Sequence, residues 1–233
     1  MSFFTPTALF YQAPVVAAAA AGIVTDGLIF YIDTTNAASY PGSGTDVFNL
    51  VAGQPITGSL VNGVTYKDGY LQFNGTNQYM TVPNTSLDYR TGTSTVMGAS
   101  RYADTTGNGR VIASLNTSTS NWLLGHFGDT TLNYYAGGTI QLNNGPNDTN
   151  WRIYAGTANT STDKWSLYVN GAVNTLDSAG GSSGPYGFGI GRNSNGTEYS
   201  SGSLAILMLY NRVLSGAEIT QNYDALKSKV GLT

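Results

Sequence analysis

The stretch 202–232, GSLAILMLYNRVLSGAEITQNYDALKSKVGL, joins a strand pattern to a helix pattern. Leu204–Tyr210 is an unbroken apolar run, which is typical of a strand that is covered on both faces of a sheet. Asn211 and Arg212 then turn the chain, and the residues that follow carry the signals of a helix start. The stretch therefore predicts one buried strand followed by a short helix. The chain before it shows only strand and loop patterns.

The helix is predicted in detail by its two ends. Ser215 is the expected N-cap, and Glu218 three residues later completes a capping box. Leu214 and Ile219 flank the cap at the spacing of a hydrophobic staple. Gly231 is expected to end the helix in the left-handed conformation. One face is apolar because apolar residues recur every three or four positions: Ile219, Tyr223, Leu226 and Val230.

The composition favours a β-sandwich. The 233 residues include 30 Gly and 16 Tyr, and 10% of them are charged, as expected for short strands joined by polar turns. Hydrophobic residues make up 41% of the chain, which is enough for a core. Because the chain has no Cys, disulfides and thiolate metal sites are excluded.

The charge distribution argues against two classes of partner. The net charge is −3, and no Lys or Arg occurs before Lys67. A chain without a basic stripe is not expected to bind nucleic acid through its phosphates. The apolar stretch Val15–Val24 is too short to span a bilayer, so no membrane span is expected.

Residues 1–26 differ from the rest of the chain and are interpreted as an N-terminal arm, ahead of one domain at 27–233. A secretory signal is an alternative, although no basic segment precedes the apolar stretch, and so is a mobile tail. We expect the arm to dock on a partner subunit, because an exposed aromatic-rich tail would be sticky. The candidate docking residues are Phe3, Phe4, Leu9, Phe10 and Tyr11.

Turn signals divide the domain into about a dozen expected strands, at the spacing of a sandwich. Gly27–Asp33 is predicted as the first strand. Asn62-Gly63 and Asn170-Gly171 are hairpin signals, and Asn74-Gly75 is expected to bend the chain between two strands within Tyr70–Val82.

Four segments in this order carry a family resemblance: GLIFYID at 27–33, LQFNGTNQYMTV at 71–82, KWSLYVNG at 164–171 and LYNRVLSGAEITQNYDAL at 209–226. Together they resemble the concanavalin A-like lectin/glucanase superfamily, specifically the laminin G-like domains of bacteriophage structural proteins. The resemblance implies an all-β fold, an antiparallel jelly-roll sandwich of two sheets whose last strand lies beside the first. The residue patterns add the short C-terminal helix and the extended N-terminal arm.

Cofactors are not expected. Many members of the family carry Asp where this chain has Asn74, and an acidic residue near the start of the last strand, where this chain has Ser203–Ile206. Because calcium needs several oxygen ligands that include carboxylates, calcium-dependent binding is disfavoured.

The sequence also predicts that the chain is not an enzyme. Glycoside hydrolysis requires two carboxylates beside the scissile bond, and hydrolases of this fold carry closely spaced acids on one strand. Here Glu198 and Glu218 are the two glutamates, and the helix cap accounts for Glu218. His126, the one histidine, has no nucleophile motif near it and is expected to be an ordinary residue at a strand end or in a loop.

Aromatic residues beside polar loops are the candidates for carbohydrate binding, since sugars stack on exposed rings: Trp122, Tyr134, Tyr135 and Trp151. Neighbouring strand residues face opposite ways, so only one of Tyr134 and Tyr135 is expected in the core. The alternative is that these are ordinary aromatic residues of the sheets.

The resemblance implies a virion surface protein, with a capsid decoration protein favoured. It would attach through its arm to other structural proteins, chiefly the capsid, and display a lectin-like domain to host-surface glycans. A tail adhesin or a secreted lectin for cell-surface carbohydrate are the alternatives. Weak single-site binding gains from multivalency, so an oligomer or multivalent display is expected.

Overall fold

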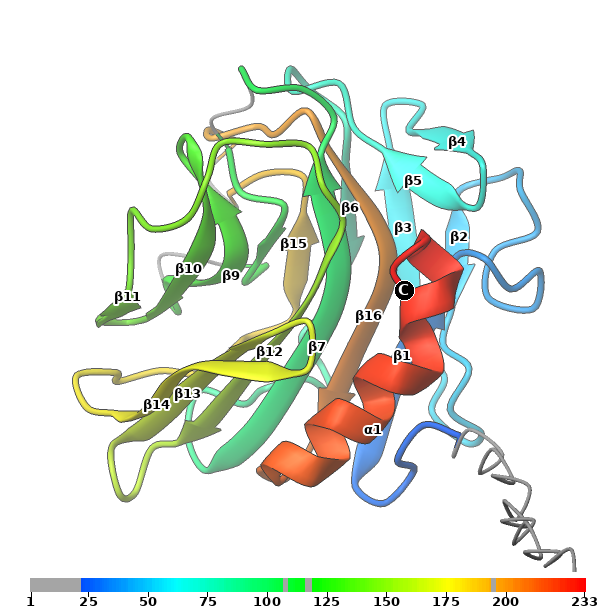
Figure 1. The fold of residues 1–233 in the computed structure, drawn as a ribbon. Coiled ribbons are helices and arrows are strands. Elements are labelled where there is room, and N and C mark those ends of the chain that lie inside the picture. The colour runs from blue at the N-terminus through cyan, green and yellow to red at the C-terminus, as the bar shows by residue number, and fades with distance from the viewer. Residues whose placement is uncertain (1–21, 107–108, 116–118, 194–195) are drawn as a thin grey trace, which may run out of the picture.

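The computed structural model describes residues 22–106, 109–115, 119–193 and 196–233, and two antiparallel sheets form a sandwich (Figure 1). One sheet, here called the helix-covered sheet, has the order β14-β13-β12-β7-β16-β5-β4, with β1 also paired to β16. Its strands are β1 (Leu28–Asp33), β4 (Thr65–Lys67), β5 (Tyr70–Gln72), β7 (Thr93–Tyr102), β12 (Arg152–Asn159), β13 (Lys164–Val169), β14 (Ala172–Ser178) and β16 (Gly202–Tyr210).

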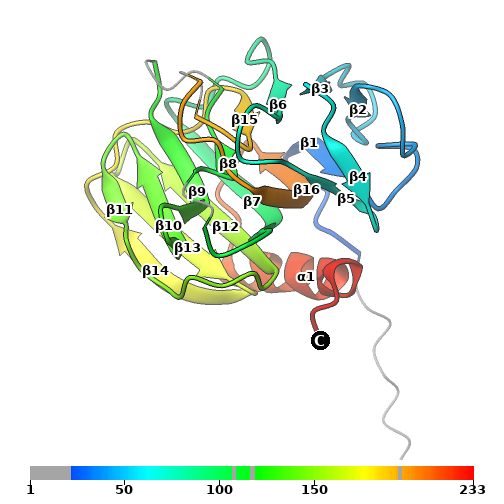
Figure 2. The same ribbon diagram turned by 90° about the horizontal axis from the view of Figure 1, so that it is seen from above.

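The second sheet, here called the opposite sheet, has the order β11-β10-β9-β8-β15-β6-β3-β2. Its strands are β2 (Asp46–Phe48), β3 (Thr57–Val61), β6 (Tyr79–Val82), β8 (Ile112–Ala113), β9 (Trp122–Phe127), β10 (Thr130–Ala136), β11 (Thr139–Gln141) and β15 (Phe188–Ile190). The all-β sandwich predicted from the sequence is thereby confirmed. Seen from above, α1 (Gly216–Leu226) lies outside the sandwich, against the helix-covered sheet (Figure 2).

The main core fills the space between the sheets and is rich in aromatic rings. Trp122 of the opposite sheet meets Tyr134 at 6.0 Å between ring centroids, and Tyr134 meets Trp165 of the helix-covered sheet at 6.2 Å. These edge-to-face contacts stabilise the packing beyond the area that they bury. Within the described residues, no helix is both long and apolar enough to cross a membrane.

β16 is buried along its whole length, as its apolar run predicts. Leu204, Leu207 and Leu209 face the main core, while Met208 and Tyr210 belong to a second apolar cluster on the outer face of the sheet. β1 pairs with β16 in antiparallel register, which confirms that the last strand returns beside the first.

The helix start matches the predicted capping box. The Glu218 backbone N–H donates to Ser215 Oγ at 3.3 Å, and the Ser215 backbone N–H donates to Glu218 Oε2 at 2.8 Å. Arg212 adds an ion pair to Glu218 at 2.6 Å, and its hydrogen bond lowers the pKa of that carboxyl to about 2. After Leu226 the last turn tightens to a 3₁₀ helix, η1 (Lys227–Val230), which ends at Gly231 with φ 72°.

The turn predictions are right locally and in part wrong about the strands that the turns connect. Asn170-Gly171, with φ of 51° and 77°, joins β13 to β14 as a hairpin. Asn62-Gly63 is also left-handed, but β3 and β4 lie in different sheets, so the predicted hairpin is wrong. Asn74-Gly75 lies between two strands, as predicted, and these strands, β5 and β6, belong to different sheets. Two residues determine how tightly a turn closes, whereas the sheet that each strand joins depends on its pairing partner, which is β6 for β3 and β5 for β4.

Residues 22–26, which the sequence patterns assign to the arm, pack on the helix side of the domain. Ile23 and Val24 contact the second apolar cluster. The Val24 backbone N–H donates to Asn222 Oδ1 at 2.7 Å, and the Tyr210 hydroxyl donates to the Val24 carbonyl at 2.9 Å. The five candidate docking residues of the arm lie outside the described residues.

Ser215→Ala is expected to lower the free energy of unfolding by about 1 kcal/mol, because one helix N–H loses its capping acceptor. Chemical denaturation measures this loss. Ser228→Ala, at an exposed position of the last turn, is the control and should change stability by less than about 0.5 kcal/mol. Ligand binding should survive Ser215→Ala; lost binding at unchanged stability would contradict a purely structural role for the cap.

Candidate functional site

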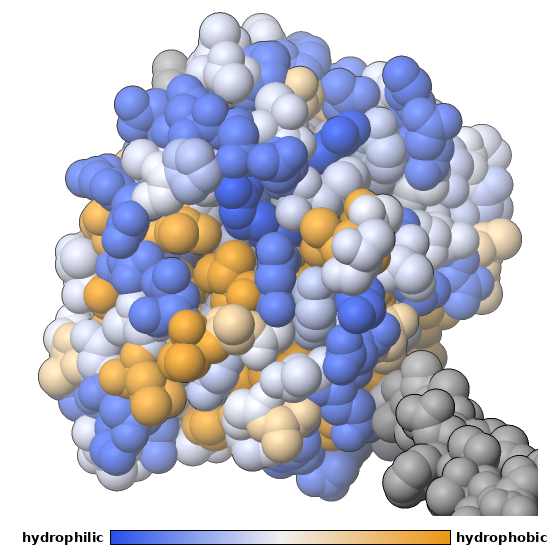
Figure 3. All heavy atoms as spheres, viewed as in Figure 1, coloured by the Kyte–Doolittle hydropathy of each residue, from blue (hydrophilic) through white to orange (hydrophobic). Residues whose placement is uncertain are grey.

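α1 and η1 leave part of the outer face of the helix-covered sheet exposed. Figure 3 shows hydrophilic side chains gathered across the upper part of this face, where Figure 1 places β4 and β5. Hydrophobic side chains gather at the lower left, near β13 and β14, in keeping with the exposed Val173 and Leu176 of β14. The hydrophilic part borders the end of η1.

Two aromatic rings face each other at this border, from segments far apart in the sequence. The Tyr70 and Trp151 rings are 5.3 Å apart between centroids at an angle of 70°, an edge-to-face contact. Arg101 lies over both, with its Cζ 4.9 Å from the Tyr70 centroid and 5.1 Å from the Trp151 centroid. Its Nη2 donates to the Tyr70 hydroxyl at 2.8 Å. All three side chains are half-buried, so the pair is held in place and still reaches solvent.

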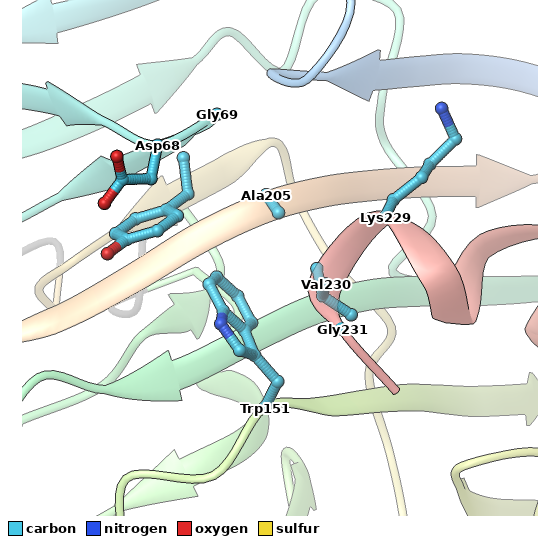
Figure 4. A pocket seen from close by; sticks show the side chains of 8 residues that line it. Asp68, Gly69, Trp151, Ala205, Lys229, Val230 and Gly231 are labelled. Carbon is cyan, nitrogen blue, oxygen red and sulfur yellow. The ribbon is translucent and has the colours of Figure 1, made fainter. Parts of the chain in front are cut away.

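A cavity of about 220 Å³ lies beside this pair, here called the C-terminal pocket (Figure 4). Ala205 of β16 forms an apolar part of its wall, and Trp151 lies across from Val230 and Gly231 at the end of η1. The residues that line it are Asp68, Gly69, Tyr70, Trp151, Ala205, Lys229, Val230 and Gly231.

Charged groups lie at the margin of the C-terminal pocket. Asp68 is exposed in the left-handed turn between β4 and β5, with φ 54°. Lys229 is tied to the buried Asp33 by an ion pair of 2.8 Å. Burial raises the pKa of Asp33, but hydrogen bonds from Lys229, Thr35 and Tyr31 outweigh it and leave the pKa below its usual value. The Asp68 carboxylate is thus the anion free to accept hydrogen bonds from a ligand at the pocket mouth.

This arrangement suits a polar ring with one apolar face. An aromatic pair supplies a stacking surface, and a carboxylate with backbone groups around it can bind hydroxyls. Among the described residues, no three His, Cys, Asp or Glu side chains lie close enough together to hold a metal ion.

The four predicted aromatic candidates do not form one site. Trp122 and Tyr134 are 0% and 1% exposed in the main core, so neither ring is accessible to a ligand, and these two predictions are corrected. Their strands turn these positions inward, where the rings contact each other. Tyr135 is half-buried on the opposite sheet, which confirms that only one of the two neighbours is in the core. Trp151 belongs to the C-terminal pocket, so Tyr135 and Trp151 are separated by the sandwich.

Tyr70, Arg101 and Asp68 were not identified from the sequence. A signal for Tyr70 exists, since it alternates with the buried Leu71 and must therefore face outward. No pattern in the sequence pairs it with Trp151, because that contact depends on the order β5, β16, β7 and β12 in one sheet, with two strands between Tyr70 and Trp151.

His126 lies near the end of β9, as expected, and is completely enclosed. Its Nδ1 is 3.2 Å from Ser100 Oγ, and its ring contacts those of Tyr102 and Tyr154 at 4.5 and 5.4 Å between centroids. Burial, with Arg152 nearby, lowers the pKa of His126 to about 3. The imidazole is therefore a neutral core group at physiological pH.

Both glutamates have structural partners. Glu198 forms an ion pair with Arg110 at 2.6 Å and accepts a hydrogen bond from Asn193 at 3.1 Å. Glu218 belongs to the helix cap. The two carboxylates therefore lie at separate places and are held by separate basic partners.

Residues 74–220 match the family described as the concanavalin A-like lectin/glucanases superfamily. This match spans more than half of the chain and includes β6 to β16. No protein among curated sequences matches the chain.

Solved structures share the fold at low sequence identity. The sialidase of Trypanosoma rangeli, in complex with sialic acid, is similar at a TM-score of 0.65 and 16% identity over 91% of this chain. The binding domain of botulinum neurotoxin serotype G matches at 0.60 and 15% over 86%, and that of Paraclostridial Mosquitocidal Protein 1 at 0.59 and 15% over 84%. The chain spans 35% of the sialidase chain and 51% and 52% of the two toxin chains.

These neighbours contradict the prediction that the chain is not an enzyme. Several of the similar structures are of a sialidase, which is an enzyme. The absence of closely spaced acids on one strand argued against one kind of glycoside hydrolase. That argument does not extend to other enzymes that contain this fold. At 16% identity the likeness concerns the fold.

The buried histidine predicts a loss of stability in mild acid. In the unfolded chain His126 has a pKa near 6.5 and binds a proton below that pH. In the folded protein its pKa is about 3, so it stays neutral until the pH approaches that value. The free energy of unfolding should therefore fall as the pH drops below 6.5, by at most about 1.4 kcal/mol per pH unit. Denaturation between pH 7.5 and 4.5 measures the slope.

His126→Phe, which keeps a ring between Tyr102 and Tyr154, should remove this part of the slope. Asp148, whose pKa Arg152 lowers to about 2 by hydrogen bonding, contributes only at lower pH, so the comparison stops at pH 4.5. Equal slopes in the two proteins would contradict the neutral, buried imidazole.

Proposed function

Because the chain belongs to the concanavalin A-like lectin/glucanase superfamily, we propose that it binds carbohydrate and that the C-terminal pocket is its sugar site. The observation that carries this proposal is the half-buried pair of Tyr70 and Trp151 beside a cavity of about 220 Å³. The pair offers aromatic surface to the apolar face of a sugar, and Asp68 offers a carboxylate to its hydroxyls.

The size of the pocket limits what it can enclose. Pockets that bury drug-sized ligands measure roughly 300–1,000 Å³, so a cavity of about 220 Å³ suits one sugar unit. The remainder of a longer glycan would extend over the hydrophilic part of the outer face. The toxin binding domains among the structural neighbours support a role for this fold in binding.

We further propose that the domain is displayed on a virion surface, as the resemblance to phage structural proteins implies, with the capsid as its partner. Gln221 donates to the Gly22 carbonyl at 2.7 Å, so an arm of residues 1–21 would leave the domain from a fixed point beside α1. Many copies on one particle would compensate for weak binding by each pocket, since linked sites raise the effective concentration of ligand.

Trp151→Ala is expected to weaken glycan binding about 10- to 30-fold, the equivalent of about 1.4–2 kcal/mol, because a stacking surface is lost. The measurement is a glycan array on the full chain, with and without calcium, followed by titration with the best ligand. Tyr135→Ala is the matched control, since Tyr135 is also a half-buried aromatic residue but lies on the opposite sheet. If Tyr135→Ala abolished binding and Trp151→Ala did not, the sugar site would lie on the opposite sheet.

Deletion of residues 1–21 should abolish attachment to virus particles and leave the melting temperature unchanged, because Ile23 and Val24 keep their contacts with the domain. Co-sedimentation with particles that lack the protein measures attachment. A second variant replaces Phe3 and Phe4 with Ser in the full chain. It should weaken attachment because docking through aromatic side chains would lose two of them. Undiminished attachment after the deletion would contradict the docking arm.

A further inference from the structure

Next to the C-terminal pocket, polar side chains from three strands lie in a row on the outer face of the helix-covered sheet. Ser203 of β16 is in register with Gln72 of β5 on one side and with Arg101 of β7 on the other. Directly opposed residues in antiparallel strands share a face, with Cβ atoms about 4.5–5.5 Å apart. Gln72, Ser203 and Arg101 therefore form a row across three strands, on the same outer face as Tyr70.

This row contains buried polar atoms that have no partner. Ser203 is 0% exposed, and its Oγ makes no hydrogen bond in the structure. The Nε of Arg101 is buried and unbonded as well. Buried polar groups are usually satisfied, because an unmade hydrogen bond costs free energy. The outer face beside the aromatic pair is therefore polar at Ser203 and Arg101, in contrast to the apolar face that α1 covers.

Arg101 also lacks a counter-charge among the described residues. Four other arginines there form ion pairs with carboxylates: Arg90, Arg110, Arg152 and Arg212. Arg101 instead contacts the rings of Tyr70 and Trp151 and the hydroxyl of Tyr70, and none of these groups carries a charge that would neutralise it. Lys67 of β4 is exposed and in register with Tyr70, so it adds a second positive charge to the same face.

The aromatic pair borders both the C-terminal pocket and this row. Tyr70 and Trp151 line the pocket, and Arg101 lies over the same two rings without being part of the pocket lining. A glycan that stacks on the pair is therefore within reach of both the pocket and the guanidinium.

Resting on the proposed sugar site, we propose that Arg101 receives a carboxylate of the glycan, so that the ligand is an acidic oligosaccharide containing a uronic acid. The guanidinium presents planar paired donors that match a carboxylate, which an ammonium does not. One sugar unit occupies the C-terminal pocket, and the adjoining uronate meets Arg101, with the half-buried Gln72 on the same face as a hydrogen-bonding group. Lys67 draws the acidic chain towards this face.

The test compares three probes on the full chain by isothermal titration: oligogalacturonates, which carry carboxylates, maltooligosaccharides, which are neutral, and dextran sulfate oligosaccharides, which carry sulfates. We expect oligogalacturonates to bind at least about tenfold more tightly than the neutral probe. Arg101→Gln should remove this preference by weakening oligogalacturonate binding at least about tenfold more than maltooligosaccharide binding, while Arg101→Lys should restore only part of it.

Arg192→Gln is the matched control, because Arg192 also stacks on a ring, 3.5 Å from the Tyr79 centroid, away from the pocket. This control should keep the preference. Melting temperatures establish that each variant is folded, and Arg101→Lys serves if Arg101→Gln does not fold.

Each contrary result has a distinct meaning. Equal binding of acidic and neutral probes would overturn the role of Arg101 and leave the sugar site standing. Preference for the sulfated probe alone would overturn the carboxylate assignment, and loss of preference in Arg192→Gln would place the charge recognition elsewhere. Failure of every probe to bind would overturn this inference together with the proposed function.

Discussion

The burial of β16 on both faces is the constraint on which the structure depends. Every residue of this strand is buried, with the main core on one side and the second apolar cluster on the other. Its edges are occupied by β7 along its length and by β1 and β5 at its two ends. A strand with no solvent-facing side requires a cover outside the sandwich, and α1 provides it with Ile219 and Leu226.

The same cover creates the candidate site because it is too short to span the sheet. Where η1 ends at Gly231, the outer face changes from apolar to polar, and β16 itself changes from Met208 to Ser203. The C-terminal pocket lies at that boundary. The ion pair of Lys229 with the buried Asp33 ties the end of η1 to β1, so the rim of the pocket is fixed to the strand beside β16.

Local sequence information was sufficient for the elements whose signals are contained within a few residues. The helix cap at Ser215 and Glu218, its stop at Gly231, the buried strand and the Asn170-Gly171 hairpin all follow from short-range chemistry. Where the prediction concerned pairing, the same kind of signal failed. Asn62-Gly63 closes a tight turn, yet its two strands join different sheets, because β3 pairs with β6 and β4 pairs with β5. These pairings involve residues outside the turn.

The sequence by itself determined the fold class, the closing strand and the capped helix, because periodicity and capping act over one to four residues. Only the tertiary structure decided which aromatic rings are accessible. Trp122 and Trp151 have similar polar neighbours along the chain, yet one is enclosed between the sheets and the other faces solvent. The contact of Tyr70, Arg101 and Trp151 is also tertiary, because it requires β5, β16, β7 and β12 to lie in order within one sheet, and strand order is set by the packing of the whole core.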